Sequence, residues 1–264
     1  MKKAFRIFRI ALLAVCAAVF LVSLAMLIKI IVGYEKADGF YDKINDGFTV
    51  SETDDKEGEA PARLVELSKY VKELKAQYPD VVGYVNVPSL GISYPVVQTD
   101  DNDYYLDHLI NGEESTSGSV FLDCRISSDP LLTKNTVLYG HNMNDGSMFH
   151  KVEEFFSSRE LFEGAVVEYV TENGAFVYTP LAIYRCEAYY PFHTYEFGSN
   201  AEFLDFCDMV SEKSFHMIDA EYDENSRLMT FATCVNSITT KNARYIYQSV
   251  LREAYTDLHG EAAE

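Results

Sequence analysis

A long apolar run near the N-terminus is the first pattern along the chain. Residues 1–9 hold four basic residues and no acid, and residues 10–28 are apolar apart from Ser23. At a rise of about 1.5 Å per residue this run spans about 28 Å, which is enough to cross a bilayer core. Lys29 can extend its amine toward the interface, and the apolar residues continue to Val32. The pattern predicts a transmembrane signal anchor over 10–33, with residues 1–9 as a cytoplasmic basic flank and the remainder outside the cell. The alternative, a cleaved signal peptide, lacks a clear small-x-small cleavage site.

Polar residues then replace apolar ones. The stretch 34–61 is most polar over 51–61, so we expect a linker that buries little surface and is loosely packed. Beyond it the apolar positions return at helical spacing, with charged residues on the other face. This pattern predicts a helical extension over 62–79, packed on the following domain through Leu64, Leu67, Val71, Leu74 and Tyr78.

From Gly83 the pattern changes to short apolar runs separated by turn residues, which is typical of β-strands. Two helical stretches interrupt them, at about 148–157 and 200–213. Many short strands in roughly 180 residues favour one closed barrel, so we expect a mainly β extracellular catalytic domain over 62–258 and a C-terminal tail over 259–264. The predicted strands are 83–88, 92–98, 104–108, 118–122, 136–141, 165–171, 175–187, 227–234 and 244–251.

The charge of the chain limits its partners. The formal net charge is −19, and without the five basic residues of the N-terminal segment residues 35–264 carry −24, from 17 basic and 41 acidic residues. Such a surface excludes nucleic acid as a ligand, because phosphate binding needs clustered Lys and Arg. No His and Cys cluster has zinc spacing and no loop has the pattern of oxygen ligands, so we expect neither a metal nor another cofactor.

A candidate nucleophile ends the strand 227–234. This strand runs into Cys234, and the strand that follows a polar loop opens with Arg244. Two neighbouring antiparallel strands would bring Cys234 and Arg244 together at one end of a sheet. A thiol attacks as thiolate, and a fixed cation nearby favours that form and stabilises an oxyanion. The candidate proton carrier is His141, which stands where the strand 136–141 opens into a loop.

The other cysteines offer a competing interpretation. Cys16 lies in the predicted anchor, and Cys124, Cys186 and Cys207 lie outside it in apolar runs. Together with Cys234 they could form two disulfides. We interpret these three as core residues and Cys234 as a free thiol, although the sequence leaves open whether any of the three is in a disulfide.

Three separated motifs occur in order and resemble those of class B sortases, the cysteine transpeptidases that attach surface proteins to the Gram-positive cell wall. The resemblance implies an eight-stranded sortase barrel with an N-terminal helical extension and a helix in the long connection before the cysteine strand. It implies cleavage of a C-terminal sorting signal after Thr through a thioester on Cys234, with transfer to an amine of the peptidoglycan precursor. The motifs are Tyr139-Gly140-His141-Asn142-Met143, Asp145-Gly146-Ser147-Met148-Phe149, and Thr230-Phe231-Ala232-Thr233-Cys234 with Arg244 ten residues later.

The resemblance also implies that Asn102, Leu106 and Tyr139 line the sorting-signal pocket, and we include Thr233 among the substrate-binding candidates. Without the resemblance, Asn102 is equally typical of a turn, and Leu106 and Tyr139 are equally typical of core packing. The chain departs from the family in having Ala232 where several members carry Ser, and Val235 where some carry an acid. We expect no catalytic role for the remaining histidines, which are His108, His150, His193, His216 and His259.

Three other functions fit parts of the pattern. A hydrolytic cysteine protease would use the same Cys234, His141 and Arg244. A pilin-polymerising sortase would join a Lys of one pilin to the Thr of the next. A membrane-anchored binding protein would not need Cys234, His141 and Arg244 all to be present. The sequence does not decide the sorting motif, the accepting amine or the oligomeric state.

Overall fold

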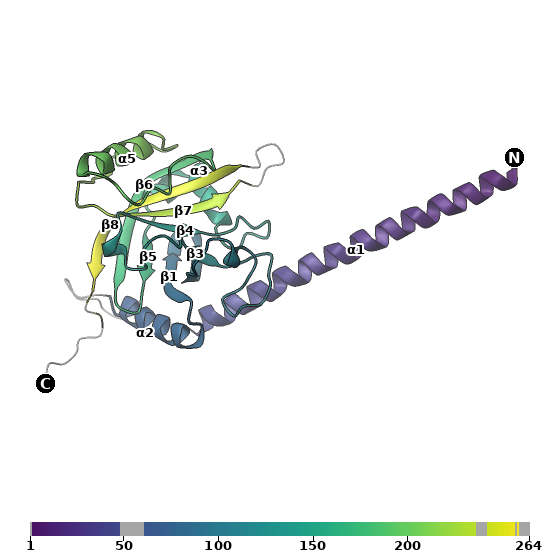
Figure 1. Ribbon diagram of the computed structural model, residues 1–264, viewed down its shortest axis with the longest axis horizontal. Coiled ribbons are helices and arrows are strands. Elements are labelled where there is room, and N and C mark those ends of the chain that lie inside the picture. Colours follow the sequence, from purple (N-terminus) through teal and green to yellow (C-terminus); the bar gives the residue numbers. More distant parts are fainter. Residues whose placement is uncertain (1, 48–60, 236–241, 257, 259–264) are drawn as a thin grey trace.

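Eight strands close into a single barrel in the computed structural model, which describes residues 2–47, 61–235, 242–256 and 258 (Figure 1). Around the barrel the order is β1-β2-β3-β4-β7-β8-β6-β5, and β5 pairs with β1 to complete it. The predicted closed, eight-stranded barrel is confirmed. The strands are β1 (Val81–Val87), β2 (Ile92–Val97), β3 (Val120–Leu122), β4 (Asn135–Tyr139), β5 (Val167–Val170), β6 (Ala175–Glu187), β7 (Leu228–Cys234) and β8 (Ala243–Tyr255).

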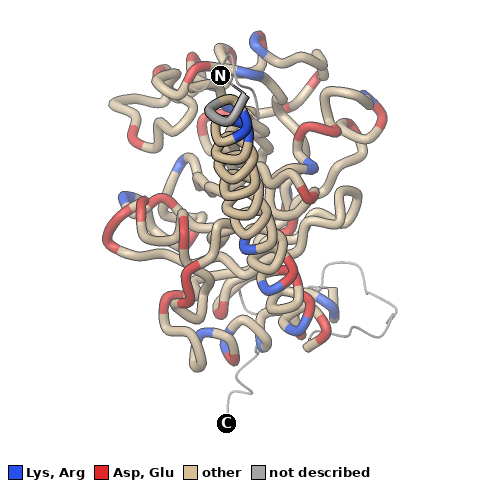
Figure 2. Tube along the Cα trace, turned by 90° about the vertical axis from the view of Figure 1, so that its right-hand side faces the viewer, with Lys and Arg blue, Asp and Glu red and all other residues tan. Residues whose placement is uncertain are grey.

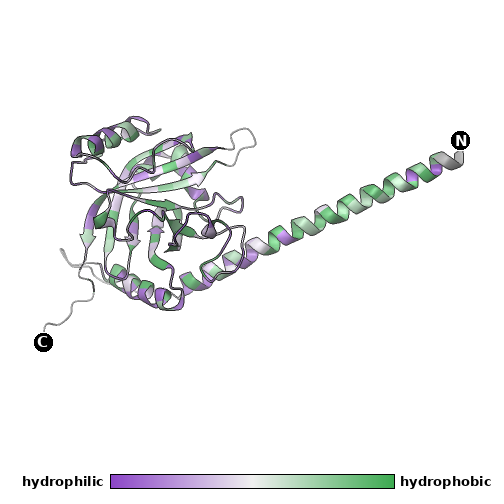
Figure 3. Cartoon of the chain, viewed as in Figure 1, coloured by the Kyte–Doolittle hydropathy of each residue, from purple (hydrophilic) through white to green (hydrophobic). Residues whose placement is uncertain are grey.

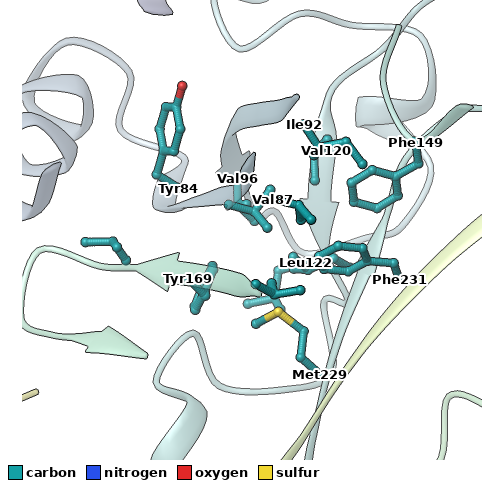
Figure 4. Packing of buried hydrophobic residues seen from close by; sticks show 14 of the residues in the cluster. Tyr84, Val87, Ile92, Val96, Val120, Leu122, Phe149, Tyr169, Met229 and Phe231 are labelled. Carbon is teal, nitrogen blue, oxygen red and sulfur yellow. The ribbon is translucent and has the colours of Figure 1, made fainter. Parts of the chain in front are cut away.

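Two of the pairs, β2–β3 and β4–β7, are parallel, and the others are antiparallel. Closure gives each of these eight strands two neighbours, which protects their edges from pairing with another chain. Apolar side chains fill the interior, where the rings of Phe149 and Phe231 stack with centroids 4.7 Å apart beside Met229 (Figure 4).

Strand β7 is buried on both faces, which explains why it reads as a nearly continuous apolar run. Met229 and Phe231 face the barrel interior, whereas Leu228 and Ala232 pack in an outer cluster with residues of helix α5 (Asn200–Glu212). Helix α5 lies in the connection between β6 and β7, as predicted, and the side chain of Ser199 caps it by accepting from the Glu202 amide. Within β7, the last residue, Cys234, is exposed and the other six are buried.

Helix α2 (Ala62–Gln77) confirms the predicted helical extension, and the other elements that follow it outside the barrel and α5 are short. The helix predicted over 148–157 is a 3₁₀ turn followed by a short helix. The elements are η1 (Pro88–Leu90), η2 (Tyr104–Leu106), η3 (Pro130–Leu132), η4 (His150–Glu153), α3 (Glu154–Ser157) and α4 (Arg159–Glu163).

The strand predicted over 104–108 is wrong, because residues Tyr104–Leu106 form the 3₁₀ helix η2. The carboxylate of Asp101 accepts hydrogen bonds from the backbone amides of Asp103 and Tyr104, each at 2.8 Å. These bonds tighten the chain into a turn and engage amides that a strand would present to a neighbour.

Helix α1 (Lys2–Asp46) projects away from the barrel as one continuous rod (Figure 1). It is the one helix in the described part of the chain that is long and apolar enough to cross a membrane. Figure 3 shows the apolar residues of its outer part, and Figure 2, which looks along it, shows acidic residues scattered over the loops of the domain.

The first part of the predicted linker 34–61 differs from the expectation of a loosely packed connector. Residues 34–46 continue α1, and Ala37, Tyr41 and Ile44 are buried against the domain. Their spacing of four and three residues places them on one helical face, so this end of α1 has an apolar stripe of its own. Residues 48–60, and the predicted tail 259–264, lie outside the described residues.

Candidate active site

The ends of β4 and β7 lie side by side at one end of the barrel. In their parallel pairing Tyr139 lies opposite Ala232, and the Gly140 amide donates to the Ala232 carbonyl at 3.3 Å. The two strands therefore end side by side, β4 next to His141 and β7 at Cys234. In the antiparallel pair β7–β8, Arg244 lies directly opposite Cys234, as the sequence predicts.

His141, Cys234 and Arg244 line the same cleft, which has a volume of about 290 Å³. The thiol of Cys234 is exposed, and Arg244 is half-buried, with a guanidinium N–H donating to the Ala243 carbonyl at 3.1 Å. A nucleophilic thiol, an imidazole and a fixed cation in one cleft provide the groups that acyl transfer through a thioester requires. Their catalytic roles remain predictions.

One hydrogen bond defines the tautomer of His141. Its Nε2 lies 2.7 Å from the carbonyl oxygen of Leu106. A carbonyl oxygen only accepts, so Nε2 carries the hydrogen, and in the neutral ring Nδ1 is the nitrogen that can take up a proton. The loop that carries Leu106 therefore orients the histidine.

The three other cysteines outside helix α1 are less exposed than Cys234. Each of the five cysteines is a free thiol, so none of the disulfides left open by the sequence is present among the described residues. Cys186 and Cys207 are core residues as predicted, and burial raises the pKa of Cys186 to about 11 and that of Cys207 to about 12. Cys124 was also predicted to be a core residue, but it is only half-buried and is not part of the core. The two buried thiols are kept protonated and covered, which leaves Cys234 as the accessible thiol in this cleft.

Asn142 is a functional candidate that the sequence analysis missed. Its side-chain nitrogen donates to the carbonyl oxygen of Cys234 at 2.9 Å, and its oxygen accepts from Nδ1 of His150 at 2.6 Å. Nε2 of His150 lies 3.4 Å from the carboxylate of Glu153. Asn142 therefore connects the nucleophile's backbone to a second histidine, and no spacing in the sequence signals this contact.

All four predicted substrate-binding residues line the cleft. Asn102 accepts from the Cys124 amide at 2.8 Å, Leu106 exposes 42 % of its surface, and Tyr139 donates to the Asp123 carboxylate at 2.9 Å. The hydroxyl of Thr233 is buried and has no hydrogen-bond partner among the described residues. The structure thus brings these side chains into the cleft that holds Cys234, and their role in binding a substrate stays a prediction.

An ion pair at the cleft was also missed. Arg125 lines the cleft and donates two hydrogen bonds, of 2.8 and 2.6 Å, to the fully buried carboxylate of Asp123. Burial acts to raise the pKa of Asp123, but the hydrogen bonds from Arg125 and Tyr139 lower it to about 2. His193, for which the sequence suggested no catalytic role, is half-buried and lines the cleft, where burial and then Arg125 lower its pKa.

The described part of the chain shows no cluster of side chains that could bind a metal ion. Within it, no set of three or more His, Cys, Asp or Glu side chains is placed to hold an ion.

Comparison with known proteins identifies the family. Residues 85–252 match the family model described as the sortase domain, and the chain therefore belongs to the sortase family. It is 28 % identical over 186 residues to sortase B of Listeria monocytogenes, covering 70 % of this chain and 75 % of that protein.

Solved structures agree with this assignment. Sortase B from Clostridium perfringens has a TM-score of 0.63 at 28 % identity, over 69 % of this chain and 99 % of the other. The fold is also that of a sortase B from B. anthracis, with a TM-score of 0.70 at 24 % identity, over 85 % of this chain and all of that one. The protein is a class B sortase, and hence a cysteine transpeptidase.

Proposed function

We propose that this sortase cleaves a C-terminal sorting signal after Thr and transfers the protein to an amine of the cell-wall precursor, with Cys234 as nucleophile. The observation that carries the proposal is the meeting of Cys234, His141 and Arg244 at one cleft, at the ends of β7 and β4 and the start of β8. Asn102, Leu106, Tyr139 and Thr233 line the same cleft and would bind the sorting signal.

The chemistry follows from these groups. The thiolate of Cys234 attacks the carbonyl carbon of the Thr residue, and its oxygen becomes an oxyanion beside the guanidinium of Arg244. The bond to the next residue breaks as protonated His141 gives a proton to the leaving amine, which leaves a thioester on Cys234. The incoming amine loses a proton to His141 and attacks the thioester carbonyl. A new amide forms, and the thiolate of Cys234 departs.

Two related structures support a peptide and an amine as the substrates. One is a substrate complex of the Staphylococcus aureus sortase B, and another is a sortase B complexed with triglycine. By similarity, the sorting signal of a surface protein would occupy the cleft first, and an amine of the peptidoglycan precursor would resolve the thioester.

The long N-terminal helix supports a location at the cell membrane. The outer part of α1 exposes apolar side chains along its length, and Lys2, Lys3, Arg6 and Arg9 precede its apolar core. We place residues 10–33 across the membrane of a Gram-positive cell, with the N-terminus in the cytoplasm and the barrel outside.

Product analysis tests the function. The full chain in detergent is incubated with the peptides Asn-Pro-x-Thr-Asn, Ser-Pro-x-Thr-Gly and Leu-Pro-x-Thr-Gly, with and without glycine or diaminopimelate as the accepting amine. The products are identified by mass spectrometry. We expect cleavage after Thr and an amine adduct, both absent from Cys234→Ala. Cleavage without any adduct would indicate a hydrolytic protease. Cleavage that survives in Cys234→Ala, or no cleavage of any peptide, would contradict the proposal.

A further inference from the structure

The hydrogen-bond acceptor of His141 belongs to a loop that helix α1 contacts from outside the barrel. We refer to residues 104–119 as the Leu106 loop. The phenol of Tyr41, on α1, lies 3.1 Å from the Gly118 carbonyl oxygen and 2.9 Å from the hydroxyl of Ser119. Tyr41 is 4 % exposed, so these contacts are shielded from water. The helix therefore reaches into the loop through a buried polar group.

The direction of these hydrogen bonds is fixed by counting hydrogens. The hydroxyl of Ser119 donates to the His108 carbonyl at 2.8 Å and has a single hydrogen. It therefore accepts from Tyr41, whose single phenol hydrogen is shared between the Ser119 hydroxyl and the Gly118 carbonyl. Burial raises the pKa of Tyr41 well above its ordinary value, so the phenol keeps its hydrogen at physiological pH.

The two ends of the Leu106 loop pack backbone against backbone. Gly118 has a φ of +55°, in the left-handed region, and a Cβ there would come within 2.7 Å of the Leu106 carbonyl oxygen. The Ser119 amide donates to the Tyr105 carbonyl at 3.0 Å. Since the space between Gly118 and the Leu106 carbonyl is too small for a methyl group, and Ser119 is hydrogen-bonded to the residue before Leu106, we infer that a shift of Gly118 or Ser119 would displace the Leu106 carbonyl.

A continuous path of contacts thus joins α1 to the candidate proton carrier. It runs from Tyr41 to Gly118 and Ser119, then through the Ser119 amide to the Tyr105 carbonyl. The next residue is Leu106, whose carbonyl accepts from Nε2 of His141 at 2.7 Å. On the outer side of the loop, Lys36 of α1 also pairs with Glu113 at 2.7 Å. This pair is exposed and contributes little to stability, so the buried phenol is the main polar contact.

We propose that Tyr41 is a positioning residue for His141, through which residues 34–46 of α1 support the active site from outside the cleft. The proposal rests on the proposed function, because it assigns His141 the proton transfers. With the Leu106 carbonyl in place, the neutral ring carries its hydrogen on Nε2. If the carbonyl shifts, the tautomer with hydrogen on Nδ1 becomes more populated, and in that tautomer Nδ1 can no longer accept a proton.

The test compares two phenylalanine variants of the full chain in detergent micelles. Tyr41→Phe removes the phenol that reaches the Leu106 loop. Tyr70→Phe is the matched control, because the Tyr70 hydroxyl donates at 2.6 Å to the carbonyl of Ile44 on the same helix. Each variant is measured for kcat and KM with the cleaved sorting peptide and for its thermal midpoint. The His141 tautomer is read from ¹⁵N spectra of histidine-labelled protein, and its signals are assigned by their loss in His141→Gln.

We expect kcat of Tyr41→Phe to fall roughly three- to tenfold and its His141 signals to show a mixture of the two neutral tautomers, Nε2–H and Nδ1–H. Tyr70→Phe should keep both the rate and the Nε2–H tautomer. The proposal is overturned if Tyr41→Phe keeps kcat within about twofold and His141 keeps the Nε2–H tautomer, or if Tyr70→Phe changes both as much. The tautomer is measured without substrate, so a protein that cleaves no peptide would contradict the proposed function while this readout still tests Tyr41.

Discussion

The side-chain amide of Asn142 donates a hydrogen bond to the carbonyl oxygen of Cys234 over 2.9 Å. The residue that follows the candidate proton carrier therefore holds the backbone of the candidate nucleophile. The other end of the amide is fixed as well, because its oxygen accepts from Nδ1 of His150. Asn142 is 7 % exposed, so water does not readily replace either bond.

Replacing Asn142 should reduce catalysis more than stability. We expect Asn142→Ala to lower kcat/KM roughly tenfold, because the end of β7 loses the bond that fixes its position. Asn142→Asp should be worse, since a carboxylate cannot donate to the Cys234 carbonyl and repels it. Steady-state kinetics with the sorting peptide measures both. Asn144→Ala in the same loop, at an exposed position, is the control and should keep full activity. Normal kinetics in Asn142→Ala would show that the bond is dispensable.

Arg244 should require its guanidinium and not only its charge. Lysine retains one positive charge but lacks the planar fork of donors, so we expect Arg244→Lys to lower kcat/KM about a hundredfold. The control is Arg252→Lys at the other end of β8, where the side chain donates to the Thr179 hydroxyl away from the cleft. Measuring kcat/KM of both variants with the same sorting peptide tests this prediction. A near-normal rate for Arg244→Lys would show that the positive charge is sufficient and that the planar fork of donors is not required.

The local pattern of the sequence predicted most of the fold, because strands and helices differ in apolar period. The exceptions were caused by contacts between distant residues or by side chains acting on the backbone. Tyr104, Tyr105 and Leu106 form a short aromatic and apolar run like that of a strand, but the carboxylate of Asp101 turns the chain into a 3₁₀ helix. Ala37, Tyr41 and Ile44 were interpreted as linker because their apolar face is short and next to polar residues.

The candidate site was predictable in part for the same reason. His141 and Cys234 end two apolar strands and Arg244 begins a third, which is visible in the sequence. Their convergence depends on the parallel pairing of β4 with β7, two strands that are far apart in the sequence, and no local pattern encodes that pairing. The contacts of Asn142 with His150, and of Asp123 with Arg125, depend on side-chain geometry and are visible only in the structure.

The Asp123 carboxylate should stabilise the fold in a pH-dependent way. Its pKa falls from an ordinary 3.8 to about 2 in the folded protein, through the bonds that outweigh its burial. A depressed pKa contributes stability that is present above pH 3.8 and is lost as the pH falls through about 2. The shift corresponds to about 2 kcal/mol at neutral pH, and roughly half should remain at pH 3.

Urea unfolding of wild type and Asp123→Asn at pH 6 and pH 3 measures this contribution. We expect the difference in unfolding free energy to be about 2 kcal/mol at pH 6 and about half of that at pH 3. Asp129→Asn is the control, because Asp129 caps the short η3 helix at the surface and has no part in the ion pair. A difference for Asp123→Asn that did not shrink with pH would mean that packing, and not the charge, supplies the stability.

Thr233 should show opposite effects on stability and on activity. Its hydroxyl is buried beside the cleft and has no hydrogen-bond partner among the described residues, so it is an unfavourable group in the protein alone. Thr233→Val keeps the shape and removes the hydroxyl, and we expect the free energy of unfolding to rise by about 1 kcal/mol. If the hydroxyl binds the sorting signal, KM should rise several-fold while Thr233→Ser stays near wild type. Thermal unfolding and peptide kinetics on the three proteins test both effects, and an unchanged KM in Thr233→Val would remove Thr233 from the substrate-binding residues.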